Sequence, residues 1–167
     1  FDIETAPLNR ERLLSQLPPF DPADVKVGNI KDPELIKAKI EGAKAKHEQD
    51  YIDKAALSAL TGSVCAIGYK FEDGTKLSSI NDSAGTTEMD LIGEFWRLWR
   101  EHNDGHTVTN FIGHNIYDFD LPFLVRRSWM LDLAVPHSVM SFFKGRPQWS
   151  ERFIDTRTVW LMGNRDG

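Results

Sequence analysis

Short apolar segments alternate with helix-forming segments along this chain, and their order limits the folds open to it. Apolar and β-branched residues predict strands over 1–5, 63–71, 76–80, 107–112 and 153–156. Apolar residues at helical spacing predict helices over 88–99 and 121–131. Because consecutive strands occur together with strands that alternate with helices, we expect an α/β fold with a mixed β-sheet flanked by helices.

Turn and capping residues mark the ends of several of these elements. Residues 72–74, Glu-Asp-Gly, supply a turn between two predicted strands and therefore predict a β-hairpin. Thr86 or Thr87 stands where it can cap the first of the two helices, and Pro122 falls in the first turn of the second.

A long polar excursion separates the first predicted strand from the second. Pro33 opens a segment rich in Ala, Lys and Glu, which predicts a helix of several turns within 34–59. Its charged side chains are typical of a solvated surface, although the lysines would also suit a phosphate backbone. We therefore expect a single domain over 1–167 that carries a helical insertion at about 7–60.

The overall charge argues against binding of nucleic acid by a basic surface, but not against a local metal-centred site for phosphate. With 25 acidic and 20 basic residues, the net charge of -5 argues against a protein that holds nucleic acid mainly by a basic surface. A local, metal-centred site for phosphate stays possible. The one cysteine excludes an intramolecular disulfide. No apolar stretch reaches the roughly 18 residues of a membrane span, so we expect a soluble, cytoplasmic protein with no membrane partner.

Two carboxylates stand one residue apart in the apolar opening sequence Phe1-Asp2-Ile3-Glu4-Thr5. Alternate residues of a strand share a face, so Asp2 and Glu4 would point the same way while Phe1 and Ile3 pack. Side by side, the two negative charges repel. A divalent cation, a basic neighbour or open water is needed to offset that repulsion.

A second group of polar residues precedes the predicted helix over 121–131. The segment Gly113-His114-Asn115-Ile116-Tyr117-Asp118-Phe119-Asp120 carries two carboxylates close to the start of that helix. Asp120 could be an N-cap that accepts hydrogen bonds from free backbone N–H groups, or a ligand of a metal ion. We interpret Asp118 as a loop or capping residue.

Together, these two segments resemble the DEDD superfamily of 3'-5' exonucleases, whose fold is that of ribonuclease H. Asp2-x-Glu4 resembles the first motif of the superfamily, and Asn115-x-x-x-Phe119-Asp120 resembles the second. The flanking sequences GHN and LPFL bring the chain closest to the exonucleases related to the editing domain of family-B DNA polymerases. The resemblance implies a ribonuclease H-like mixed β-sheet.

The resemblance also implies a role for each matching residue. Asp2, Glu4 and Asp120 would be the catalytic carboxylates and would bind two divalent cations, Mg²⁺ or Mn²⁺, at the scissile phosphate. Thr5, Asn115 and Phe119 would contact or orient the substrate strand. Phe119 could equally be a core residue, since an aromatic residue beside a helix start packs readily. The implied substrate is the single-stranded or frayed 3' end of DNA, in proofreading or repair in a bacterium or phage, with a polymerase or other replication protein as a possible partner.

The superfamily also has a third motif, Tyr-x-x-x-Asp or His-x-x-x-x-Asp, which supplies the last metal ligand and the general base. The only match, Tyr69 to Asp73, precedes the second motif and lies on the predicted hairpin, so we do not assign it to the site. We expect the third motif beyond Gly167, in a longer protein whose fold is incomplete here at the C-terminus. Asp155, in the sequence Asp-Thr, is expected to be structural.

Two alternatives stay open at the level of the sequence. An exoribonuclease of the same fold would differ in contacts to the 2'-OH, which no motif reports. A non-catalytic module that binds nucleic acid or protein would retain the fold without a complete site. Arg126, Arg127 and Trp129 could lie along a nucleic-acid strand, but we expect a solvated face for the two arginines, with Trp129 packed inward.

Overall fold

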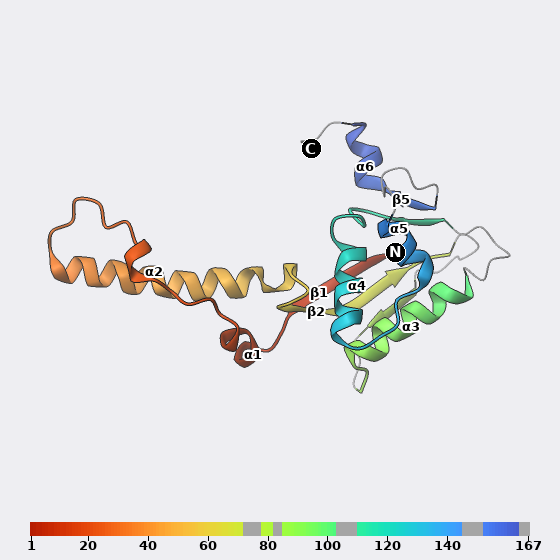
Figure 1. The fold of residues 1–167 in the computed structure, drawn as a ribbon, viewed down its shortest axis with the longest axis horizontal. Coiled ribbons are helices and arrows are strands. Elements are labelled where there is room, and N and C mark those ends of the chain that lie inside the picture. The colour runs from red at the N-terminus through yellow and green to blue at the C-terminus, as the bar shows by residue number, and fades with distance from the viewer. Residues whose placement is uncertain (72–77, 82–84, 103–109, 145–151, 164–167) are drawn as a thin grey trace. The chain divides into compact units, whose positions relative to one another are not determined.

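The chain forms a mixed α/β structure with two small β-sheets (Figure 1). The computed structural model describes residues 1–71, 78–81, 85–102, 110–144 and 152–163. The strands in these ranges are β1 (Asp2–Pro7), β2 (Gly62–Tyr69), β3 (Ser78–Asn81), β4 (Phe111–Gly113) and β5 (Phe153–Asp155). The helices are α1 (Arg10–Ser15), α2 (Pro33–Lys54), α3 (Glu88–Glu101), α4 (Asp120–Met130), α5 (His137–Lys144) and α6 (Thr156–Leu161), with short 3₁₀ helices η1 (Pro22–Asp24) and η2 (Ala55–Leu57).

The chain divides into two compact units, one of which interrupts the other in sequence. The first unit comprises residues 1–5 together with 63–167, and the second comprises residues 6–62. The second unit thus covers the part of the chain in which we expected an insertion. The chain leaves the first unit through β1 and returns to it through β2.

The first unit contains both sheets. One has the strand order β1-β2-β3, in which β2 and β3 are antiparallel and Ile67 pairs with Ile80. This pairing confirms the two strands of the expected hairpin, whose turn at 72–74 lies outside the described residues. In the other sheet, β4 and β5 are parallel, with Phe111 opposite Phe153. Residues 107–109 of the strand that we expected before β4 are also outside the described ranges.

A hydrogen bond links the start of β1 to β4. The backbone nitrogen of Phe1 donates to the carbonyl oxygen of Ile112 at 2.7 Å. Gly113, at the end of β4, lies so close to this strand that an added Cβ would be 2.6 Å from the carbonyl oxygen of Phe1 and 2.3 Å from Cγ2 of Ile116. The glycine of the GHN sequence is therefore required by the close approach of two backbones.

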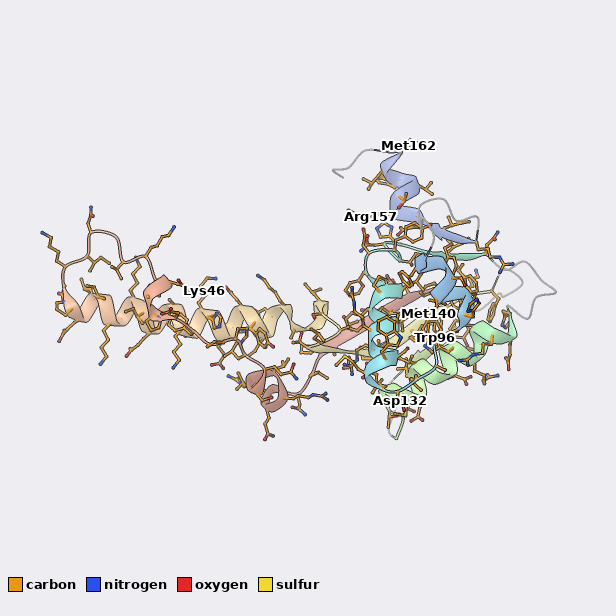
Figure 2. The ribbon with its side chains drawn as sticks, viewed as in Figure 1. Lys46, Trp96, Asp132, Met140, Arg157 and Met162 are labelled. Carbon is orange, nitrogen blue, oxygen red and sulfur yellow. The ribbon has the colours of Figure 1, made fainter. Side chains whose placement is uncertain are left out.

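The N-terminus of α3 confirms one of the expected caps. Thr87 accepts a hydrogen bond from the N–H of Asp90, and the Asp90 carboxylate accepts from the N–H of Thr87, which completes a capping box. The buried face of α3 is formed by Leu91, Ile92, Phe95, Trp96 and Trp99. Figure 2 shows Trp96 where α3 lies against α4, and there its Nε1 donates to the hydroxyl of Ser128 at 2.8 Å.

Six aromatic side chains, which we call the Trp99 cluster, join the elements of the first unit. The ring of Trp99 stacks on Phe111 with a centroid separation of 3.6 Å and planes 4° apart. It also contacts Phe153 at 5.7 Å and Phe1 at 6.0 Å. The members of the cluster are Phe1, Phe95, Trp96, Trp99, Phe111 and Phe153. Through them α3 packs against the start of β1 and against both strands of the parallel pair.

A buried ion pair connects α4 to α3. The guanidinium of Arg127 donates to the Glu88 carboxylate at 2.5 and 2.8 Å, and the two side chains are only 3% and 15% exposed. The same carboxylate accepts from the backbone N–H of Val64 in β2. Our expectation of a solvated Arg127 was therefore wrong, because an acidic partner from α3 compensates its burial.

The expectation for Trp129 was also wrong. The buried residues of α4 are Asp120, Leu121, Phe123, Leu124, Val125, Arg127 and Ser128. Trp129 follows Leu124 by five positions, about 140° further around the helix, and its side chain is 61% exposed.

The second unit is built around α2, which confirms the expected long helix after Pro33. Asp32 caps α2 by accepting from the N–H of Glu34, and no residue of the helix is fully buried. Arg10 of α1 pairs with Glu48 of α2 at 2.6 Å. Across the described residues, no helix combines the length and the apolar character needed to span a bilayer.

We predict that removing only one partner of the buried ion pair destabilises the protein strongly. Arg127→Met leaves the Glu88 charge buried and should lower the free energy of unfolding by about 3–5 kcal/mol, measured by urea denaturation. Adding Glu88→Gln, which retains an acceptor for the Val64 N–H, should restore part of that loss. An Arg97→Met control breaks the exposed pairs with Glu94 and Glu101 and should have a much smaller effect. A loss below about 1 kcal/mol for Arg127→Met would contradict the assignment of a tightly held pair.

Candidate metal centre

The strand β1 presents the two carboxylates of the first motif on one face. Asp2 and Glu4 are exposed, whereas Ile3 between them is 5% exposed and lies in the core. The alternation expected from the sequence is therefore present. Thr5 is half-buried and shares the face of Ile3 rather than that of the carboxylates. Its side chain is thus the least suited of the predicted residues to contact a substrate held by Asp2 and Glu4.

The carboxylate of the second motif reaches the first motif through a long-range hydrogen bond. Asp120 Oδ1 accepts from the backbone N–H of Ile3 at 3.0 Å, across 117 positions of the chain, and Asp120 is 3% exposed. The alternative interpretation of Asp120 as an N-cap was wrong. Asp120 is the first residue of α4, and Phe119 occupies the capping position without a side-chain hydrogen bond.

The environment of Asp120 disfavours a negative charge in the absence of a cation. Burial raises the pKa of its carboxyl to about 6, the hydrogen bond from Ile3 lowers it by a smaller amount, and the nearby charge of Asp2 raises it. The influence of Asp2 shows that the two motifs place their carboxylates within electrostatic reach of each other. A cation bound between them would relieve both the burial and the repulsion.

The donor set has the chemistry of a magnesium or manganese site. Carboxylate oxygens are the hard ligands that these ions prefer, and Mg²⁺ commonly takes one or two protein carboxylates together with water and substrate phosphate. Within the described ranges, no three side chains of His, Cys, Asp or Glu lie close enough together to hold one ion. Asp2 and Asp120 would therefore need substrate phosphate and water to complete the coordination of an ion, and the structure does not gather Glu4 with them around one point.

The turn that leads from β4 to Asp120 is built on the carboxylate of Asp155. This carboxylate accepts from the backbone N–H groups of Asn115 at 2.8 Å, Tyr117 at 3.1 Å and Arg157 at 2.9 Å. The last of these bonds makes Asp155 the N-cap of α6. The structural role expected for Asp155 is confirmed. The strand that we expected to extend to Thr156 instead ends at Asp155, because the cap starts a helix there.

Asn115 adopts a backbone conformation that few residue types tolerate. Its φ of 60° lies in the left-handed region, which asparagine enters more readily than other residues with side chains. Its carbonyl oxygen accepts from the N–H of Phe119 at 3.0 Å, directly before Asp120. The structure thus gives Asn115 a part in shaping the turn.

Arg157 is a charged residue next to the site that the sequence analysis did not single out. Figure 2 shows it at the start of α6, where its Nη1 lies 3.1 Å from Asp118 Oδ2 and 3.4 Å from Asn115 Oδ1. The only sequence signal for this contact was the position of Arg157 just after the Asp-Thr cap. Asp118 is an exposed loop residue, as expected. The remaining predicted residue, Phe119, is half-buried, and its ring centroid is 5.5 Å from that of Phe123.

A comparison of the chain with models of protein families, with curated proteins and with solved structures finds no match. The resemblance to the DEDD exonucleases therefore rests on the two sequence motifs alone.

We predict that Gly113→Ala destabilises the first unit. A methyl group at this position would meet the backbone oxygen of Phe1 at 2.6 Å, so β1 and β4 would have to separate. We expect a loss of about 1–3 kcal/mol in the free energy of unfolding, the usual cost of overpacking. Gly42→Ala in α2, where a Cβ meets nothing within 4 Å, is the control and should be neutral or stabilising. Equal effects of both substitutions would argue against the close approach.

A second prediction concerns pH. The folded pKa of Asp120 is about 6, above the value near 4 of an unfolded Asp, so the folded state binds this proton more tightly. Its contribution to stability is therefore complete below about pH 4 and is lost as pH rises to about 6. Asp120→Asn keeps the acceptor for Ile3 and removes the titration. Without metal, wild type should lose on the order of 2 kcal/mol relative to Asp120→Asn over this range, measured by thermal unfolding in EDTA.

The same variant tests the metal centre. Because a cation competes with the proton on Asp120, Mn²⁺ should raise the melting temperature of wild type more at pH 7.5 than at pH 5. The increase should be absent in Asp120→Asn. A Mn²⁺ effect that is equal in both proteins would place the cation elsewhere.

Proposed function

We propose that this chain is a metal-dependent 3'-5' exonuclease domain that hydrolyses phosphodiester bonds at the 3' end of single-stranded or frayed DNA. The observation that carries the proposal is the hydrogen bond between Ile3 and Asp120. It joins the centre of the Asp-x-Glu motif to the last residue of the Asn-x-x-x-Phe-Asp motif. If the two short motifs occurred by chance, we would not expect a hydrogen bond between them.

The arrangement of the elements around this contact supports a ribonuclease H-like fold. The antiparallel pair β2–β3 lies beside β1, the start of β1 bonds to β4, and β4 is parallel to β5. Figure 1 shows α3 and α4 next to these strands. This is a mixed set of strands flanked by helices, with both motifs at the junction of β1 and α4.

The residues of the site have distinct tasks in the proposed reaction. Asp2, Glu4 and Asp120 would hold Mg²⁺ or Mn²⁺, which when bound supplies the positive charge that polarises the phosphate and acidifies the attacking water. Buried Asp120, fixed by Ile3, positions its carboxylate against the strand. Asp155 fixes the turn from Asn115, which would set the geometry in which Asp120 and the half-buried Phe119 meet the terminal nucleotide.

A non-catalytic nucleic-acid-binding module is the second candidate. It is favoured by the observation that the described carboxylates do not gather three ligands around one point. An exoribonuclease is a variant of the first candidate. It would differ from the DNA exonuclease in cleaving strands whose sugar carries a 2'-OH. Both alternatives are resolved by one experiment.

We predict that 5'-labelled single-stranded DNA is shortened from its 3' end in the presence of Mn²⁺ or Mg²⁺, read as a ladder on a denaturing gel. Asp2→Ala/Glu4→Ala and Asp120→Asn should each lower the rate by roughly 10⁴-fold, the scale for loss of one member of a catalytic unit. Glu41→Gln removes an exposed carboxylate of the second unit and should retain full activity.

The matched RNA substrate identifies an exoribonuclease if RNA alone is degraded. If neither polymer is cleaved while DNA is still bound, the chain is a binding module. Equal activity in Asp120→Asn and wild type would refute the proposed site.

A further inference from the structure

The side of α4 away from its buried face carries a row of exposed and half-buried residues. Phe119, Pro122, Arg126 and Trp129 follow one another at spacings of three and four, so they form one stripe along the helix, which we call the outer stripe. Phe119 and Pro122 are half-buried, Arg126 is exposed and Trp129 is 61% exposed. The stripe starts next to Asp120 and extends about 15 Å along the helix.

The composition of the outer stripe differs from that of an ordinary solvated helix face. Such a face usually carries charged side chains with partners three or four positions away, as α3 does where Arg97 pairs with Glu94 and Glu101. The outer stripe instead has a tryptophan in water and a guanidinium between two aromatic residues. The indole of Trp129 and the guanidinium of Arg126, three positions apart on the same face, therefore combine a stacking surface with a positive charge.

Arg126 has no ion-pair partner among the residues that the structure describes. In this it differs from Arg127 and Arg157. Arg127 is neutralised by Glu88 and Arg157 by Asp118. In a chain with a net charge of -5, an exposed guanidinium six positions along α4 from Asp120 provides positive charge for an anion.

The alternation of aromatic rings with a guanidinium selects one class of ligand. Single-stranded nucleic acid has a planar base and a phosphate in each unit, and proteins bind it by stacking bases on aromatic rings and pairing phosphates with Arg. A purely apolar protein surface would bury the charge of Arg126 without a partner, which is unfavourable. The 15 Å length of the stripe matches about four stacked nucleotides at 3.4 Å each.

We propose that the outer stripe of α4 is a track for the single-stranded segment upstream of the 3' end, with a base stacked on Trp129 and a phosphate on Arg126. The direction of the strand rests on the proposed function, since the 3' end must lie at Asp120. The affinity for a single strand does not depend on that function. The track explains how a site made of carboxylates retains a polyanion.

The test measures the binding of fluorescently labelled dT10 and dT2 in EDTA, where cleavage is prevented, by anisotropy. Trp129→Ala should weaken dT10 binding by about 5- to 150-fold, the effect of one lost base stack, and leave dT2 binding unchanged. Arg126→Gln should weaken dT10 binding and reduce the slope of log affinity against log salt by about 0.7. Trp160→Ala and Arg12→Gln, which remove an exposed tryptophan and an arginine outside the stripe, should match wild type.

Each result has a separate meaning for the track and for the enzyme. If wild type and Trp129→Ala bind dT10 equally, or if wild type does not bind dT10, the track is refuted whether or not the protein cleaves DNA. If Trp129→Ala loses dT10 binding while wild type cleaves neither polymer, the track holds and the exonuclease proposal fails. If Trp129→Ala instead changes the sedimentation of the free protein, the stripe is a contact between copies of the chain and the track is refuted.

Discussion

The flat contact between Trp99 and Phe111 connects the parts of the first unit that would otherwise have little reason to meet. Neither sheet is large, and β4 and β5 have three residues each. Such short strands bury little on their own and need a packed face for stability. Trp99 provides that face, because its ring contacts Phe1 at the start of β1 and Phe153 in β5 while α3 holds it in place. The geometry around Asp120 depends on this packing, since Gly113 and Ile112 approach Phe1 only where the cluster brings β4 to β1.

The parts of the fold that the sequence predicted are those governed by local periodicity and local hydrogen bonds. The alternation of Asp2, Ile3 and Glu4 follows from the two-residue period of a strand, and a cap at Thr86 or Thr87 follows from a threonine directly before a helical pattern. Asp120 was ambiguous because a carboxylate at a helix start has two uses. The sequence could not show that the carboxylate accepts a hydrogen bond from Ile3, which is 117 positions away in the chain. Helix α6 was missed for a related reason, since an apolar segment of three residues does not reveal that Asp155 will cap a helix.

Burial of polar residues was the other point at which the sequence was insufficient. Arg126 and Arg127 are adjacent and chemically identical, yet Arg126 is exposed whereas Arg127 is buried and paired with Glu88. What buries Arg127 is its ion pair with Glu88 of α3, and the sequence near the two arginines does not show this partner. Trp129 shows the reverse case, in which a large apolar residue remains outside because the helical period directs it away from the core. At the candidate site, the three carboxylates were predicted from the sequence, whereas Arg157 and the outer stripe were identified only in the structure.

The hydrogen bond from Ile3 to Asp120 has a consequence for how the protein behaves in solution. In the order β1-β2-β3, β1 is the terminal strand, and the free N–H groups of such a strand can recruit another chain into the sheet. The N–H groups of Ile3 and Phe1 are both already occupied, by Asp120 and by Ile112. The buried carboxylate thus closes an edge at which molecules could otherwise add to one another. Asp120, for which we propose a catalytic role, would in this way also oppose aggregation.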